Sequence, residues 1–263
     1  MHYAIIALLL IASVAAKAET PATDNPIEQL AKQLDVGRTE GTLIWLEAGG
    51  SKTFAVVSEA AARAPQGGII LLHDLGAHGD STQLIAPLRQ RLAQYGWTCM
   101  SVHVPALNEQ RQAPAADLTK HIQDLIGAAS QQLAQKNMKL MAVVAHGASA
   151  PLAASALGAA AGSIRALVAL SPSVPKTPDP ALDMVATYRA LNLPLLDVYG
   201  EADYPAVIQQ ADARAAAKRT GTPANDALFR QIVIPGADHQ YLNQEDLLTR
   251  RIVGWLRKTL SPE

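Results

Sequence analysis

The chain has almost no cysteine, few aromatic residues and little net charge. One of its 263 residues is cysteine, Cys99, which excludes an internal disulfide. Aromatic residues make up 4% of the chain and the formal net charge is −1, so the clustered cations and stacking rings of a nucleic-acid surface are missing. Hydrophobic residues make up 49%, enough at this length for the core of one α/β domain. We therefore predict a single domain that binds no nucleic acid.

Residues 1–18 are predicted to be a signal peptide. Tyr3–Ala16 is almost entirely apolar but shorter than the ~20 residues that a transmembrane helix needs. The sequence Ala-Lys-Ala that ends at Ala18 fits an A-x-A cleavage site. We expect cleavage after Ala18, a periplasmic or secreted mature protein, and no stable membrane insertion afterwards. Residues 19–41 are assigned to a linker with a short helix, and residues 42–263 to the folded domain.

The folded domain alternates between short apolar runs and amphipathic stretches. The first two runs flank a Gly-Gly turn and predict a hairpin, and the later runs alternate with helical patterns, which favours parallel pairing. The pattern predicts an α/β fold with an eight-stranded, mostly parallel sheet flanked by helices. The expected strands are Thr42–Glu47, Thr53–Ser58, Gly68–His73, Trp97–Val104, Leu140–Val144, Arg165–Leu170, Pro194–Tyr199 and Ala227–Ile234; the expected helices are Ile27–Leu34, Ser81–Tyr95, Ala115–Lys136, Pro151–Ala161, Pro205–Lys218 and Asn243–Thr259.

A nucleophile elbow is predicted after the fifth strand. The apolar run Leu140–Val144 leads into a turn of small residues, and an alanine-rich helix follows. In such an elbow the tip residue has a positive φ, and small residues two places before and after it let strand and helix approach. Ala145 and Ser149 are these small residues, which places Gly147 at the tip, where no side chain can attack a substrate.

Polar residues follow other strands at the same predicted edge of the sheet, where sites of α/β proteins lie. Asp203 follows the seventh strand, His239 follows the eighth, and Asp74 closes the third. His73 and His146 also end strands, and we expect each to hydrogen-bond neighbouring backbone.

These motifs resemble the α/β-hydrolase superfamily, in which the strand is followed by G-H-S-x-G. The segments LLHDLGAHGD, IAPLRQRLAQYGW and VVAHGAS are similar to an exported bacterial family of hydrolase-like proteins of unknown function, in which an elbow without serine is not unusual. The resemblance covers roughly residues 42–260. It implies an α/β-hydrolase fold with a minimal cap and a Gram-negative, periplasmic setting.

The resemblance also assigns positions to individual residues. His239 and Asp203 match the catalytic histidine and acid, and Gly147 stands where the serine nucleophile should be. Asp74, Leu75 and Ala148 form the oxyanion region, where a carboxylate at Asp74 opposes the developing negative charge. We therefore expect lost catalysis, and a binding role for a small ligand or an envelope protein in the former active-site cleft. Under this interpretation Gly147→Ser restores the missing hydroxyl and becomes labelled by an activity probe.

Two alternatives remain open. A register shifted by two residues makes Ser149 the nucleophile of a serine hydrolase of the esterase or amidase type, acting with His239 and Asp203. Metal-assisted chemistry is the second, if His73 and His78 converge with the two aspartates and His239, although their spacing matches no recognised ligand motif. Our expectation is that the protein uses neither a metal nor a cofactor.

Overall fold

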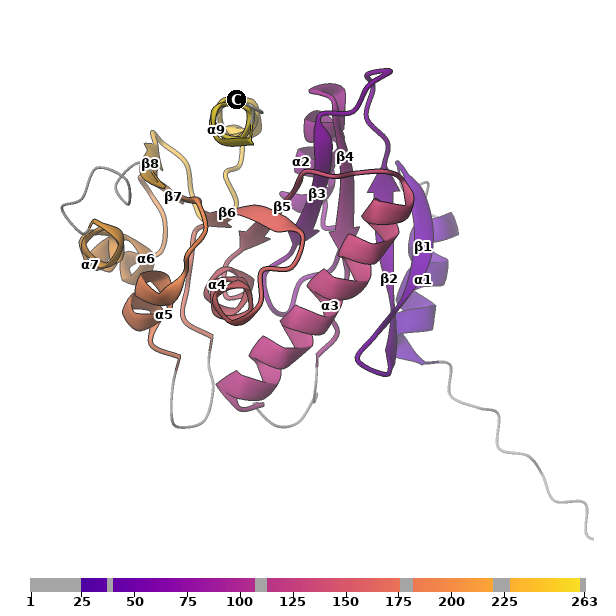
Figure 1. Ribbon diagram of the computed structural model, residues 1–263, viewed down its shortest axis with the longest axis horizontal. Coiled ribbons are helices and arrows are strands. Elements are labelled where there is room, and N and C mark those ends of the chain that lie inside the picture. Colours follow the sequence, from indigo (N-terminus) through magenta and orange to yellow (C-terminus); the bar gives the residue numbers. More distant parts are fainter. Residues whose placement is uncertain (1–24, 37–39, 107–112, 176–181, 220–227, 261–263) are drawn as a thin grey trace, which may run out of the picture.

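An eight-stranded sheet forms the centre of the computed structural model, which describes residues 25–36, 40–106, 113–175, 182–219 and 228–260. The strand order is β1-β2-β4-β3-β5-β6-β7-β8 (Figure 1). The pairs β1–β2 and β2–β4 are antiparallel, and all the other pairs are parallel. The predicted fold class is therefore confirmed. The strands are β1 (Thr42–Ala48), β2 (Ser51–Ser58), β3 (Gly67–Leu72), β4 (Trp97–Val102), β5 (Met141–His146), β6 (Ile164–Leu170), β7 (Leu195–Gly200) and β8 (Phe229–Ile234).

Helices cover both faces of the sheet because the central strands are apolar on both sides. In each of the strands β3, β4 and β5, all six residues are buried. On one face α3, α4, α5 and α7 contribute to one core cluster, and on the other α2 and α9 contribute to a second (Figure 1). The helices are α1 (Pro26–Val36), α2 (Ile85–Gln94), α3 (Ala115–Gln135), α4 (Ser149–Ala159), α5 (Met184–Ala190), α6 (Pro205–Gln209), α7 (Ala211–Lys218) and α9 (Glu245–Leu260).

Several helix boundaries differ from those predicted. Helix α2 begins at Ile85 rather than Ser81, which leaves Pro87 in its first turn, where a missing N–H costs nothing. The predicted helix Pro205–Lys218 is divided at Gln210 into α6 and α7. Helix α5 was not predicted; the Asp183 side chain caps it by accepting a hydrogen bond from the Ala186 N–H.

The register between β3 and β5 decides which loops meet at the carboxyl edge of the sheet. Leu72 pairs with Ala145 in this parallel ladder. Asp74 lies two residues after Leu72, and Gly147 lies two residues after Ala145. The two therefore come next to each other. This pairing is the basis of the site described below.

The predicted signal peptide lies outside the described residues, as do residues 19–24 and 37–39 of the segment assigned to the linker and its short helix. Among the helices that the structure does describe, none is both long enough and apolar enough to cross a membrane.

Candidate functional site

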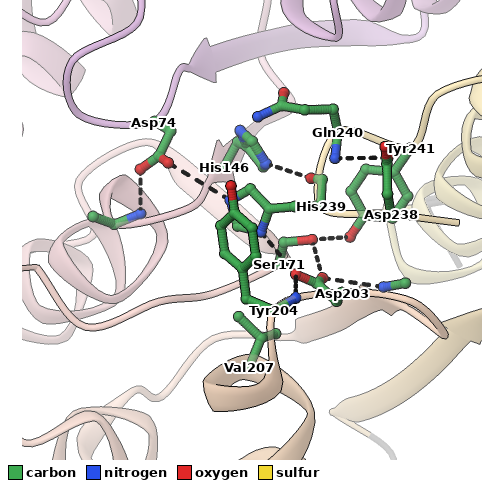
Figure 2. A network of polar contacts seen from close by, with 12 residues as sticks. Asp74, His146, Ser171, Asp203, Tyr204, Val207, Asp238, His239, Gln240 and Tyr241 are labelled. Carbon is green, nitrogen blue, oxygen red and sulfur yellow. Dashed lines mark hydrogen bonds and ion pairs between the residues drawn. The ribbon is translucent and has the colours of Figure 1, made fainter.

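The loops after five neighbouring strands meet at the carboxyl edge of the sheet. Asp74 follows β3, Gly147 follows β5, Ser171 follows β6, Asp203 follows β7 and His239 follows β8. Figure 2 shows the side chains of Asp74, Ser171 and Asp203 around the His239 imidazole. The site is therefore assembled from residues that are up to 165 positions apart in the chain (239 − 74).

Gly147 occupies the tip of the predicted elbow. Its φ is +60°, and it lies between the last residue of β5 and the start of α4. Ala145 and Ser149 are both fully buried, as the close approach of strand and helix requires. The backbone geometry of a nucleophile elbow is thus present without a nucleophile.

Ser149 lies in the first turn of α4 and not at the tip. Its hydroxyl donates a hydrogen bond of 2.6 Å to the carbonyl oxygen of His73, which ties the helix to the end of β3. Among the described residues no hydrogen bond joins Ser149 to His239. This arrangement favours the register with Gly147 at the tip over the one with Ser149 as nucleophile.

His239 and Asp203 form a buried pair. The Nδ1 of His239 lies 2.7 Å from Asp203 Oδ1, and both residues are at most 5% exposed. The expected proximity of the two side chains is confirmed. Tyr204, which is 57% exposed, stacks its ring on the imidazole at a centroid distance of 4.1 Å.

Ser171 and Tyr241 support this pair, and the sequence analysis missed both. The Ser171 hydroxyl donates to Asp203 Oδ2, and the Tyr241 hydroxyl lies 2.9 Å from both Ser171 Oγ and the Val198 carbonyl. Ser171 has a φ of +46°, which is uncommon for a residue other than glycine. One signal could have revealed it, because Ser171 directly follows an apolar strand, as the predicted site residues do.

The Asp74 carboxylate fills the region where a nucleophile and an oxyanion would lie. Its Oδ1 accepts hydrogen bonds from the backbone N–H groups of Leu75 (2.8 Å) and Ala148 (2.7 Å). Its Oδ2 lies 3.6 Å from His239 Nε2, as an ion pair rather than a hydrogen bond. The two N–H groups of the predicted oxyanion region are thus occupied by a carboxylate of the chain itself.

The same carboxylate excludes a side chain at position 147. A Cβ built on Gly147 would overlap Cγ and both carboxylate oxygens of Asp74. Gly147→Ser therefore does not meet a vacant site: the Asp74 carboxyl group must move before the hydroxyl can take the tip position.

The histidines at the ends of β3 and β5 have the backbone contacts that were expected. His146 Nε2 donates to the His239 carbonyl at 2.9 Å, and His73 Nε2 accepts from the Val104 N–H at 2.8 Å. Burial lowers the pKa of His146 to about 4 and that of His73 to about 3, so both are neutral at pH 7. His73 therefore faces the segment just after β4, where it contacts Val104 and His103. In the described part of the chain, no group of three or more His, Cys, Asp or Glu residues is placed to hold a metal ion.

The electrostatic state of the site follows from its two carboxylates. Burial lowers the pKa of His239, but Asp203 and Asp74 together outweigh this and raise it to about 9. Burial likewise raises the pKa of Asp74, yet His239 and the Ala148 N–H keep it below its usual value. At neutral pH a protonated imidazole thus lies between two carboxylates, and its Nε2 cannot accept a proton.

This charge arrangement predicts an unusual titration. We expect the ¹⁵N NMR signals of the His239 ring to titrate near pH 9, and Asp74→Asn to move the midpoint downward because one carboxylate is removed. Protonated His239 stabilises the folded state through its two carboxylate partners. This stabilisation is complete below the ordinary histidine pKa of 6.5 and is lost as the pH rises through about 9. His146, with a pKa of about 4, is the internal control. A His239 midpoint near 6.5 in both proteins would contradict the assignment.

A cavity of about 500 Å³ lies away from this site. It opens between the β1–β2 turn, the middle of α3 and the end of α4. Its lining includes Asp124, Gly127 and Ser163 but none of the residues around His239. Cavity and candidate site are therefore separate places on the molecule.

Comparison with protein families identifies the chain. Residues 2–119 and 108–258 match the family described as "Protein of unknown function (DUF3530)". The chain belongs to this family. The family description names no activity, and no curated protein matches the chain.

Solved structures show the same fold at low sequence identity. Est1E from Butyrivibrio proteoclasticus is 16% identical with a TM-score of 0.64, and the match covers 85% of this chain and 100% of that one. A dienelactone hydrolase from Anabaena variabilis is 14% identical with a TM-score of 0.67, covering 84% and 98%. A Pyrococcus furiosus esterase is 13% identical with a TM-score of 0.67, covering 87% and 96%. At these identities the likeness establishes the α/β-hydrolase fold alone.

Proposed function

We propose that this protein of the α/β-hydrolase fold performs no serine hydrolysis and that its His239 site binds a small ligand or an envelope protein. One observation carries the proposal: the Asp74 carboxylate lies in front of Gly147 and accepts hydrogen bonds from the backbone N–H groups of Leu75 and Ala148. Three requirements of serine hydrolysis are then missing together, namely the hydroxyl, the free oxyanion donors and a neutral histidine.

The surroundings of the imidazole support a binding role. Asp74 has a side chain that is 27% exposed, and the exposed ring of Tyr204 lies against His239. A partly exposed carboxylate beside an exposed aromatic ring offers a ligand both a charge and an apolar surface. The ligand therefore meets a polar group at Asp74 and a flat apolar face at Tyr204.

A fluorophosphonate probe tests the loss of serine hydrolysis. We expect the purified protein to remain unlabelled, because the probe reacts only with a serine that a neutral histidine activates. Ser149→Ala serves as the matched variant and should behave identically, since Ser149 is bonded to the His73 carbonyl. Labelling that disappears in Ser149→Ala would overturn the proposal.

The alternative is a serine hydrolase of the esterase or amidase type that uses Ser149 with His239 and Asp203; the Pyrococcus furiosus neighbour is named as an esterase. It requires Asp74 to leave the region in front of Gly147 and Ser149 to leave the His73 carbonyl. The hydrogen bonds of both residues favour the binding role.

Export is the second part of the proposal, and it rests on the sequence of residues 1–18. We expect the mature protein in the periplasmic fraction to begin at Glu19, directly after the Ala-Lys-Ala motif. Intact-mass spectrometry of that fraction measures this directly. A chain that retains Met1 and sediments with membranes would contradict export.

A further inference from the structure

The cavity between the β1–β2 turn, α3 and α4 contains a glycine in the middle of a helix. Gly127 lines the cavity and lies near the centre of the 21-residue helix α3. A Cβ built on Gly127 would meet no packed neighbour within 4 Å. Glycine inside a helix lowers its stability relative to alanine. Packing among the described residues therefore does not require this glycine, whereas an open cavity does.

Polar side chains surround Gly127, one helical turn away on either side. Gln123 and Asp124 precede it, and Ser130 and Gln131 follow it, at the spacing that places them on the same face of α3. Side-chain amides and hydroxyls both donate and accept hydrogen bonds. On the side of α4 the cavity is lined by alanine and leucine. The lining therefore suits a ligand that carries hydroxyl groups on an apolar carbon frame.

The charge of the lining favours a cation. The described residues that line the cavity include the acidic residues Glu47 and Asp124 but no lysine, arginine or histidine. Arg165 bonds the carbonyl of Gly162 from outside the cavity. The last turn of α4 also lines the cavity and has no basic residue, so its partial negative charge is not offset within the helix. A positively charged ligand group is therefore attracted to this place.

Asp124 is the side chain that can hold such a group. Lys120 donates hydrogen bonds to both of its oxygens, at 2.5 Å to Oδ1 and 2.6 Å to Oδ2. The carboxylate also lies against the β1–β2 turn, where a Cβ built on Gly49 would overlap Oδ2. The Lys120 side chain is 66% exposed, and exposed ion pairs within a helix are weak. The ammonium group of a ligand can therefore replace Lys120 at this carboxylate.

We propose that the cavity is a second ligand site, which binds a small hydroxylated primary amine, such as an amino sugar, through Asp124. The ammonium group pairs with the carboxylate, and the hydroxyl groups meet the polar side chains around Gly127. This inference is independent of the proposed function, because none of the described residues that line the cavity belongs to the His239 site.

Titration of the ¹⁵N-labelled protein with glucosamine and with glucose tests the site and its charge preference together. The two sugars differ in one group, an amine in place of a hydroxyl, and the amine is protonated at about pH 6. We expect glucosamine to shift the NMR amide signals of Gly127 and Gly162 but not that of Gly147. Glucose should bind about tenfold more weakly, because it lacks the charge-assisted hydrogen bond. No shift at Gly127, or equal affinity for both sugars, would overturn the inference.

Two variants that remove the same ion pair separate ligand binding from a structural role. Asp124→Asn should lower the affinity for glucosamine about tenfold and remove its advantage over glucose. Lys120→Met should raise the affinity for glucosamine about twofold, because the competing ammonium group is gone. If the pair only stabilised α3, both variants would change the affinity in the same direction, and that result would contradict the proposed site.

Gly127→Leu tests the cavity itself. Leucine has a higher helix propensity than glycine, so α3 should stay folded while the new side chain fills the cavity and abolishes binding. Glu59→Gln is the matched control, because it removes a carboxylate from another exposed ion pair, with Lys136, outside the cavity. Its affinity for glucosamine should be unchanged. Binding that survives in Gly127→Leu, or that falls as much in Glu59→Gln as in Asp124→Asn, would show that the sugar does not bind here.

Discussion

The double variant Asp74→Gly, Gly147→Ser is expected to hydrolyse p-nitrophenyl acetate at least about 10²-fold faster than Gly147→Ser alone. In the single variant the new Cβ overlaps the Asp74 carboxyl group, so neither side chain can take its proper position. Removing the carboxylate opens this space for the serine hydroxyl. It also frees the N–H groups of Leu75 and Ala148, which then can stabilise the oxyanion.

Removing Asp74 also makes His239 a better base for the new serine. Asp74 is one of the two carboxylates that outweigh burial and raise the pKa of His239 to about 9. Without it the pKa falls, and a larger fraction of the imidazole is neutral and able to accept the serine proton at pH 7. Asp203 still holds Nδ1 at 2.7 Å, so the ring keeps its orientation.

Three further variants separate these effects. Asp74→Gly alone has no nucleophile and should show no burst with the ester, and His239→Gln in the double variant should abolish the gained activity. Ser149→Ala in the double variant should leave it unchanged, because Ser149 bonds the His73 carbonyl. A serine at 147 also costs on the order of 1 kcal/mol of stability, since a side chain is forced to positive φ. Equal rates for the single and double variants would show that Asp74 is not what blocks the elbow.

Replacing Arg214 with leucine is expected to lower the free energy of unfolding by about 3–5 kcal/mol. Arg214 and Asp197 are both fully buried, with Arg214 Nε 2.8 Å from Asp197 Oδ2. Removing the guanidinium leaves the Asp197 carboxylate buried with only Gln231 as a side-chain hydrogen-bond partner among the described residues. The Val207 carbonyl in α6 also loses its donor.

Urea unfolding of a double-mutant cycle measures this effect. Asp197→Leu combined with Arg214→Leu should be more stable than Arg214→Leu alone, because no unpaired charge remains in the core. Lys136→Met is the matched control, because it removes an ion pair at the surface. The side chain of Lys136 is 40% exposed and that of its partner Glu59 is 60% exposed. We expect this variant to change the free energy of unfolding by at most about 1 kcal/mol. A loss below about 1 kcal/mol in Arg214→Leu would contradict the prediction.

The sequence by itself determined the fold class and the backbone frame of the site. Apolar runs bounded by turns encode buried strands, because burial follows local periodicity. The small residues around Gly147 encode the tight turn, and the positions of Asp203 and His239 after their strands place both at one edge of the sheet. These features depend on residues close together in the chain, and each was recovered with the correct strand.

Only the tertiary structure decided what occupies the site. Asp74 and Gly147 meet because Leu72 and Ala145 pair in the β3–β5 ladder, and that register is a property of the whole sheet. The direction of the Asp74 carboxylate depends on the Ala148 N–H, which comes from a segment 74 residues away. Ser171 and Tyr241 reach Asp203 in the same way, across strands rather than along the chain. The sequence could place a carboxylate near the elbow, but only three-dimensional packing placed it inside the space that a nucleophile needs.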